Sequence, residues 1–157
     1  MVLAVHDPTR PWQAMTVGRG SRGPARACLG PLDAAEARAA LDEMVGLYRA
    51  GLHAPLPLPL KTAERYAATR RRGTGGSVAS ARLAAAQEWD GGRFPGEGAD
   101  AEHALLHGAE PALDVLTAQP PAAGETGAGW PTDETDRFGL LSRRLWDRLQ
   151  AHERDRP

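Results

Sequence analysis

The sequence predicts an α/β protein of the α+β type, with a small antiparallel sheet near the N-terminus packed with several helices. Three short strand-like segments lie within about residues 2–30, separated by turns rich in proline and glycine. Apolar residues then recur at helical spacing after Asp33 and again before the C-terminus. At 157 residues the chain is long enough for one core, so we expect a single domain over residues 1–157.

The expected strands cover residues 2–5, 12–17 and 26–29. The segment "HDPTRP" separates the first two, and the glycine-rich "GRGSRG" separates the second from the third. Segments this short with turn residues between them are typical of an antiparallel meander. The first apolar residues, "VLAV", follow Met1 directly, and we expect the sequence to be a fragment of something longer.

The strongest helix signal follows Asp33, which is placed to cap a helix with Glu36 three residues later. Gly51 is expected to end this helix, because glycine is favoured just past a helix C-terminus. One face of the helix carries an apolar stripe at helical spacing. Its members are Leu41, Met44, Val45, Tyr48 and Leu52.

The stretch "APLPLPLK" at residues 54–61 excludes a helix, because each proline holds the preceding residue in an extended conformation. It has two interpretations. It is a stiff crossover whose leucines pack on the core, or a polyproline ligand for another protein. The first is favoured because docking ligands usually sit in polar, disordered segments. A helix with Thr62 as its cap is expected to follow.

The remaining elements are helical pieces separated by loops. Ser77 is expected to cap an alanine-rich helix that "DGG" ends, and shorter helices are expected around residues 101–107 and from Pro111. A mobile surface loop is expected at about residues 119–134. A final helix over residues 137–150 places an apolar stripe on one face. The stripe comprises Phe138, Leu141, Leu145, Trp146 and Leu149.

Charge and composition narrow the function classes. The net charge of −1 gives no overall basic field, so any nucleic-acid role must depend on a local patch. Cys28 is the single cysteine, which excludes an intrachain disulfide and a thiolate zinc site. The sequence contains no signal-peptide pattern and no apolar run of membrane-spanning length. We expect a cytoplasmic protein without membrane contact.

Two charged segments are candidates for function. In "RRRGTGGS", Arg70, Arg71 and Arg72 either end a helix favourably for its dipole or contact DNA phosphates. The segment lacks G-K-[ST], so it is not a nucleotide-binding loop. His103 and His107 lie four residues apart, but Ala104 stands where a metalloprotease motif has glutamate. We interpret them as a surface pair.

A metal-dependent nuclease site is disfavoured by the sequence. Glu97, Asp100 and Glu102 crowd one segment, and no lysine follows an acidic residue at the two-residue spacing that such sites use. Lys61, the only lysine, is preceded by Pro59 and Leu60. The chain alone is therefore expected to have no catalytic, cofactor or metal site.

The order of several motifs resembles a known family. The succession "RPWQAMTVGR", "LDEMVGLYRAGLHAPLPLPLKTAERYA", "RLAAAQEWDGGRFPGEGADAEH" and "RFGLLSRRLWDRL" is similar to the C-terminal domain of the exodeoxyribonuclease V gamma chain, the RecC family. The likeness covers nearly the whole chain. The residues that carry it are Tyr48, Gly51, Pro55, Leu56, Pro57, Lys61, Tyr66, Trp89, Phe94, Gly96 and Glu97.

The resemblance implies a degenerate restriction-endonuclease-like domain that has lost its active site. It further implies a non-catalytic role in subunit assembly and in guiding single-stranded DNA during recombinational repair of double-strand breaks. The implied partners are RecB-like and RecD-like subunits and DNA within the complex. Magnesium and ATP belong to those partner subunits of an ATP-dependent exonuclease and helicase. The alternative is a stand-alone protein-interaction module that uses the Leu/Pro segment or the arginine patch.

Overall fold

The chain is seen in a computed structural model that describes residues 1–20, 23–109 and 111–154. It divides into two compact units. Unit 1 contains Met1–Leu56 and the residues from Arg148 onward, and unit 2 is Pro57–Asp147. Helices and antiparallel strands occur together, so the α+β class is confirmed. The prediction of one domain over residues 1–157 stays a prediction.

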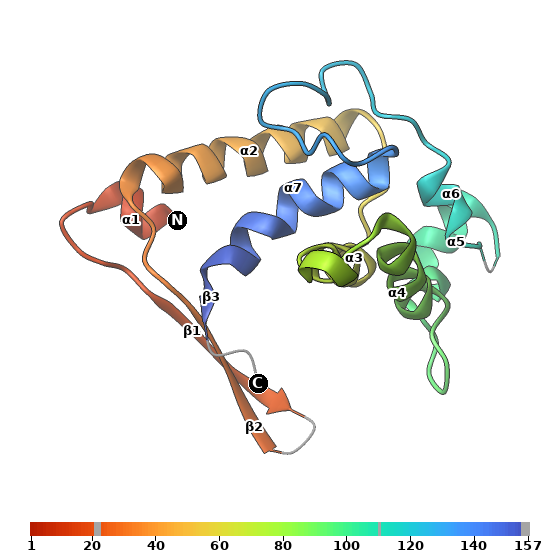
Figure 1. Ribbon diagram of the computed structural model, residues 1–157, viewed down its shortest axis with the longest axis horizontal. Coiled ribbons are helices and arrows are strands. Elements are labelled where there is room, and N and C mark those ends of the chain that lie inside the picture. Colours follow the sequence, from red (N-terminus) through yellow and green to blue (C-terminus); the bar gives the residue numbers. More distant parts are fainter. Residues whose placement is uncertain (21–22, 110, 155–157) are drawn as a thin grey trace. The chain divides into compact units, whose positions relative to one another are not determined.

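Unit 1 contains a sheet in the order β1-β2-β3 (Figure 1). The strands are β1 (Ala14–Gly20), β2 (Gly23–Leu29) and β3 (Glu153–Arg154). β1 and β2 form an antiparallel hairpin in which Ala14 is opposite Leu29, and Leu29 is also opposite Glu153. The antiparallel pairing of the second and third expected strands is confirmed. The third strand of the sheet, however, comes from the far end of the sequence.

The predicted strand over residues 2–5 is wrong, because this segment forms helix α1 (Val2–His6). Ala4 is buried, and α1 packs against α2 (Ala34–His53). A run of four apolar residues has no periodicity that distinguishes a buried strand from one turn of a helix. Packing of the small Ala4 side chain on the neighbouring helix decides between them.

Helix α2 (Ala34–His53) begins as predicted, with the Asp33 carboxylate accepting a hydrogen bond from Glu36 N at 2.7 Å. It does not end at Gly51, which is helical, but continues to His53. The buried residues of α2 are Ala37 and Ala40. The apolar stripe is largely exposed, with Tyr48 68% and Leu52 67% accessible. Helical spacing therefore placed these side chains on one face but not in the core.

Unit 2 is built on helices α3 (Leu60–Arg70) and α4 (Val78–Asp90), which pack side by side (Figure 1). α4 begins as predicted, since Ser77 Oγ accepts a hydrogen bond from Ser80 N at 3.1 Å, and it ends before Gly91. The core of this unit consists mainly of alanine and large aromatic or aliphatic side chains. Its buried members are Ala63, Tyr66, Ala81, Ala85, Trp89, Leu113, Leu116 and Phe138.

The Leu/Pro segment contributes to unit 2 from Pro57 onward. Pro57 and Pro59 are buried, and Leu58 packs against the core, so the predicted packing of a leucine is confirmed there. Leu60, in contrast, is 59% exposed. The segment is extended and leads directly into α3, whose N-cap residue is Pro59 rather than the predicted Thr62.

The rest of unit 2 consists of short elements and the first part of the last helix. These are η1 (Gly73–Gly75), η2 (Glu97–Ala99), α5 (Ala101–His107), α6 (Asp114–Thr117) and α7 (Arg137–His152). Phe138 and Leu141 on α7 are buried, and Trp146 packs against the core. Three residues of the predicted apolar stripe thus belong to the core of unit 2 or pack against it. No helix among the described residues is long and apolar enough to cross a membrane.

Residues 119–134 contain no helix or strand, but several side chains of α7 bind them. Arg137 donates to both carboxylate oxygens of Glu125, at 2.8 Å from Nε to Oε2 and from Nη2 to Oε1. The Arg144 guanidinium lies 3.9 Å from the Trp130 ring centroid. Burial raises the pKa of Glu125, but hydrogen bonds from Arg137 and from Ala122 N–H outweigh it and hold that pKa below its usual range. The mobility of this loop stays a prediction.

Candidate functional site

The densest group of polar side chains lies within unit 2 and is called here the Glu134 cluster. It comprises Tyr66, Arg70, Asp133, Glu134 and Arg143. α3 supplies Tyr66 and Arg70, the segment before α7 supplies the two acidic residues, and α7 supplies Arg143. Residues that are far apart in the sequence thus meet around one carboxylate.

Glu134 is the centre of this cluster, and its side chain is fully buried. Its Oε2 accepts a hydrogen bond from the Tyr66 hydroxyl at 2.5 Å, and its Oε1 accepts one from Arg70 Nε at 2.7 Å. Arg143 Nη1 lies 3.4 Å from the same Oε1. A buried carboxylate is tolerated only when it is paired and hydrogen-bonded, and Glu134 meets both conditions.

Asp133 lies at the outer edge of the cluster and binds the same two arginines. Arg143 Nη1 donates to its Oδ1 at 2.6 Å, and Arg70 Nη2 donates to its Oδ2. Burial raises the pKa of Asp133, but the charges of Arg143 and Arg70 outweigh that effect and hold it below its usual value. The two arginines therefore bridge a buried and an exposed carboxylate.

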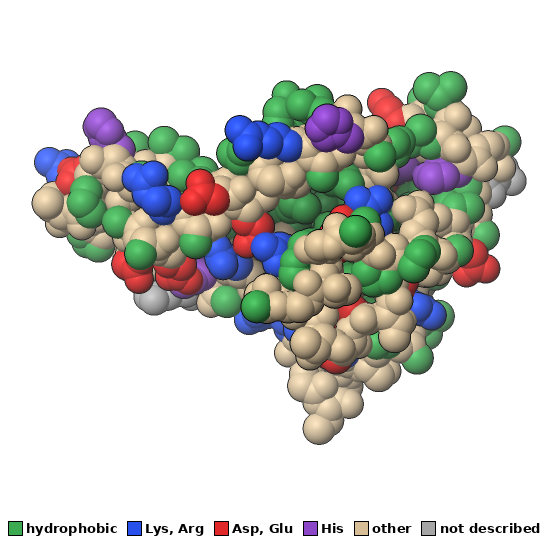
Figure 2. All heavy atoms as spheres, turned by 90° about the horizontal axis from the view of Figure 1, so that it is seen from above, with side chains coloured by type: hydrophobic (Ala, Val, Ile, Leu, Met, Phe, Trp, Pro, Cys, Tyr) green, Lys and Arg blue, Asp and Glu red, His purple; other side chains and the backbone are tan. Residues whose placement is uncertain are grey.

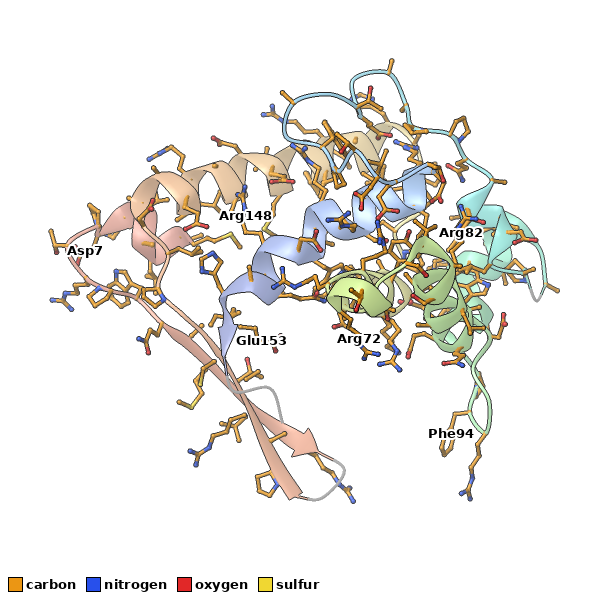
Figure 3. The ribbon with its side chains drawn as sticks, viewed as in Figure 1. Asp7, Arg72, Arg82, Phe94, Arg148 and Glu153 are labelled. Carbon is orange, nitrogen blue, oxygen red and sulfur yellow. The ribbon has the colours of Figure 1, made fainter. Side chains whose placement is uncertain are left out.

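Asp136 is a second buried carboxylate, which forms an ion pair and also caps a helix. Its Oδ2 accepts a hydrogen bond from Arg82 Nη2 on α4 at 2.7 Å (Arg82 is labelled in Figure 3). Its Oδ1 accepts one from Gly139 N at 2.8 Å in the first turn of α7. One carboxylate thus links α4 to the start of α7. The Asp136 side chain is 5% exposed and that of Arg82 is 42% exposed, so the carboxylate is desolvated while its partner still contacts solvent.

The surroundings within the cluster shift the pKa values of two further groups, Tyr66 and Arg70. Burial, the hydrogen bond to Glu134 and the nearby carboxylates all raise the pKa of Tyr66, so its hydroxyl remains a donor. Burial lowers the pKa of Arg70, but the hydrogen bond and charge of Glu134 raise it more, and the net direction is upward. In both cases the surroundings favour the protonated form of the group, which is the form that donates these hydrogen bonds.

The three arginines predicted to contact DNA phosphates have different surroundings. Arg70 is inside the Glu134 cluster, with a side chain 10% exposed, and it also donates to the Gly76 carbonyl. Arg71 Nη1 donates to the Asp147 carbonyl at 3.0 Å. Arg72 lies just beyond α3 and is exposed (Figure 3). Of the three, Arg71 and Arg72 are accessible, and DNA contact by any of them stays a prediction.

The carboxylates considered for a nuclease site do not converge. Glu97 is 8% exposed and accepts hydrogen bonds from the backbone of Lys61 at 3.1 Å and Thr62 at 2.7 Å. It therefore supplies the side-chain cap of α3 from 35 residues away. Asp100 and Glu102 are exposed. Within residues 1–20, 23–109 and 111–154, no group of three or more His, Cys, Asp or Glu side chains is arranged to hold a metal ion.

We expect Glu97→Ala to lower the free energy of unfolding of unit 2 by about 1–2 kcal/mol, because two N–H groups at the start of α3 lose their acceptor. Urea denaturation followed by circular dichroism measures this effect. The exposed neighbour Glu102→Ala is the matched control and should change the free energy by less than about 0.5 kcal/mol. Equal effects of the two substitutions would contradict the capping role.

Trp89 anchors the segment that carries Glu97. It is 1% exposed, and its Nε1 donates to the Pro111 carbonyl at 2.5 Å. Its ring centroid lies 4.8 Å from that of His103. A Cβ added to Gly98 would approach the indole to 2.6 Å, so only glycine permits this close contact.

His103 is half-buried and its ring lies 6.5 Å from that of His107, so the predicted surface pair is only partly at the surface.

The structure divides the other residues of the family motifs into two groups. Tyr66, Trp89, Pro57 and Glu97 are buried, and Gly96 permits a close backbone contact with Trp89. Tyr48, Gly51, Pro55, Lys61 and Phe94 are exposed. The exposed group contributes little to the core of either unit, although the same motifs contain both groups.

Sequence reasoning missed the Glu134 cluster and the neighbouring pair of Arg82 and Asp136. Asp136 had a local signal, since it stands three residues before Gly139 at the start of a helix, which is an N-cap pattern. Glu134 had no such signal, because its partners Tyr66 and Arg70 precede it by more than 60 residues. Only tertiary packing brings them together, with the Tyr66 ring centroid 5.2 Å from that of Phe138 in the first turn of α7.

The fold and the cluster together define an α+β polypeptide whose buried carboxylates are bound by arginine, tyrosine and backbone donors. Residues 2–71 match the family model of the RecC C-terminal domain.

The chain is 36% identical to the RecBCD enzyme subunit RecC of two Mycobacterium tuberculosis strains (CDC 1551 and H37Rv), and 35% identical to that of Mycolicibacterium smegmatis. Each alignment covers 98% of this chain, and the chain spans 13% of the length of these relatives. The predicted resemblance to the RecC C-terminal domain is confirmed. No solved structure shows a significant match.

Proposed function

We propose that this chain acts as a non-catalytic, RecC-like C-terminal domain in double-strand-break repair by recombination. Its roles are assembly with RecB-like and RecD-like subunits and guidance of single-stranded DNA within the complex. The observation that carries this proposal is the similarity to mycobacterial RecC along 98% of the chain. The degenerate nuclease-like architecture implied by the resemblance is part of the same proposal.

The geometry of unit 2 supports a structural role for its carboxylates. Metal-assisted phosphate cleavage requires carboxylate oxygens that converge on one ion. In unit 2 the oxygens of Glu134 and Asp136 accept hydrogen bonds from arginines, and those of Glu97 accept from the backbone of α3. Each of these groups therefore has a partner that holds the fold together.

The surface charge supports only a limited DNA-binding role. Figure 2 shows Lys and Arg side chains interspersed with Asp and Glu over the face that it displays. Binding of single-stranded DNA through Arg71 and Arg72 would consist mainly of counterion release, and it should weaken steeply as salt rises. This salt dependence is the signature we expect of the guidance role.

The proposal is tested with the purified chain, labelled single- and double-stranded DNA, magnesium or manganese, and ATP present or absent. We expect neither cleavage nor unwinding. In parallel, gel filtration with purified RecB and RecD of M. tuberculosis should show a complex that contains this chain. Cleavage that Asp100→Ala abolishes would overturn the non-catalytic role. Failure to form the complex would overturn the assembly role.

A further inference from the structure

The turn between α4 and η2, with the sequence "GGRFPGE", presents an aromatic ring to solvent. Phe94 is 75% exposed and lies at the tip of the turn, pointing away from the helices (Figure 3). The Arg93 guanidinium carbon lies 5.9 Å from the Phe94 ring centroid. A ring this exposed contributes little burial to its own fold, although Phe94 belongs to the sequence motifs that resemble the RecC family.

The backbone of this turn is held firmly. Gly91 and Pro95 form a β-bridge, and Gly92 N donates to the Phe94 carbonyl at 3.0 Å. Gly91 has a φ of +73°, and a Cβ there would approach Gly96 N to 2.2 Å. The two ends of the turn join Trp89 and Glu97, which are both buried. A fixed backbone lowers the entropy lost when the ring is bound by a partner.

The charge around the turn indicates the kind of partner. Between residues 88 and 102, Arg93 is the single basic residue among five acidic ones, and Lys61 adds a second positive charge beside this segment, since its backbone binds Glu97 and it lines the same pocket as Glu88. The five acidic residues are Glu88, Asp90, Glu97, Asp100 and Glu102, of which only Glu97 is buried. A surface with this charge balance repels a phosphate backbone and complements a basic protein surface.

We propose that Phe94 is the anchor residue of a protein–protein contact, entering an apolar pocket with a basic rim on a partner subunit. Aromatic and arginine side chains dominate the binding energy of such contacts, and Arg93 stands beside the ring. The carboxylates next to the turn pair with the rim of the pocket. This inference rests on the proposed function, because it names the segment through which the domain joins its complex.

The test measures the affinity of the labelled full chain for purified RecB and RecD of M. tuberculosis. Phe94→Ala should weaken binding about 30-fold, which is the effect of a typical anchor residue. Phe94→Tyr should retain affinity within about threefold, because it keeps the ring. Leu83→Ala is the matched control, since Leu83 is an apolar residue 65% exposed on α4, and it should change affinity by less than threefold. Unchanged thermal unfolding of Phe94→Ala confirms that its fold is intact.

The outcomes separate this inference from the proposed function. If the native chain binds and Phe94→Ala binds equally well, the anchor role is overturned and the assembly role stands. If the native chain does not bind either subunit, the assembly role fails and the anchor role fails with it. If Phe94→Ala weakens binding to a single-stranded oligonucleotide but not to the subunits, the ligand of the turn is nucleic acid and the protein contact is overturned.

Discussion

Replacing Glu134 with alanine is expected to lower the free energy of unfolding of unit 2 by about 3–5 kcal/mol. The substitution removes the acceptor of the Tyr66 hydroxyl and of Arg70 Nε, and it leaves the Arg70 guanidinium, which is 10% exposed, with the outer carboxylate of Asp133 and the Gly76 carbonyl as its remaining partners. Breaking one side of a buried pair costs more than the pair contributes, because the remaining charge stays desolvated. Chemical denaturation followed by circular dichroism measures the loss.

Two further substitutions separate charge from packing in this prediction. Tyr66→Phe removes one hydrogen bond to a charged acceptor and should cost about 1.5–3 kcal/mol, less than Glu134→Ala. Asp133→Ala removes the exposed carboxylate of the cluster, whose side chain is 59% accessible, and should cost less still. An equal loss for Glu134→Ala and Asp133→Ala would contradict the central position of Glu134.

Replacing Trp89 with alanine is expected to cost about 3–5 kcal/mol as well, for a different reason. The side chain is 1% exposed within the core of unit 2, so its removal leaves a large cavity and deprives the Pro111 carbonyl of its donor. Loss of the ring also removes the wall against which Gly98 packs. Differential scanning calorimetry should show a marked fall in the melting temperature.

Phe94→Ala is the matched control for Trp89→Ala, because both remove an aromatic ring from the same segment. Phe94 is 75% exposed, and we expect its removal to change stability by less than about 0.5 kcal/mol. A large loss for Phe94→Ala would show that the ring is buried, which would also contradict its role as an exposed anchor.

The elements that the sequence predicted correctly are those with local signals. The caps at Asp33 and Ser77 and the apolar spacing of the last helix depend on residues within a few positions of one another. The helix at Val2–His6 and the strand at Glu153–Arg154 were missed, because they depend on contacts with distant segments. The cap of α3 by Glu97 is non-local in the same way.

The candidate site likewise combines residues that local sequence motifs indicate with roles that depend on contacts between distant segments. Motif similarity indicated Trp89, Glu97 and Tyr66, and the structure places them within unit 2. Their roles could not be predicted, since Glu97 acts on α3 and Tyr66 acts on Glu134 only through tertiary packing. The same motif also contained Phe94 and Tyr48, and no local pattern distinguished their exposed rings from buried ones.

The pairing of β2 with β3 has a consequence for the order in which the chain folds during synthesis. Unit 2 is one continuous stretch, Pro57–Asp147, and all of its contacts are available before α7 is complete. Unit 1 needs Leu29 and Glu153, which lie more than 120 residues apart, so its sheet closes only after unit 2 has left the ribosome. Until then the hairpin of β1 and β2 has a free edge that the nascent chain cannot yet cover with β3. We therefore expect the hairpin to be the segment most prone to pairing with other chains during translation.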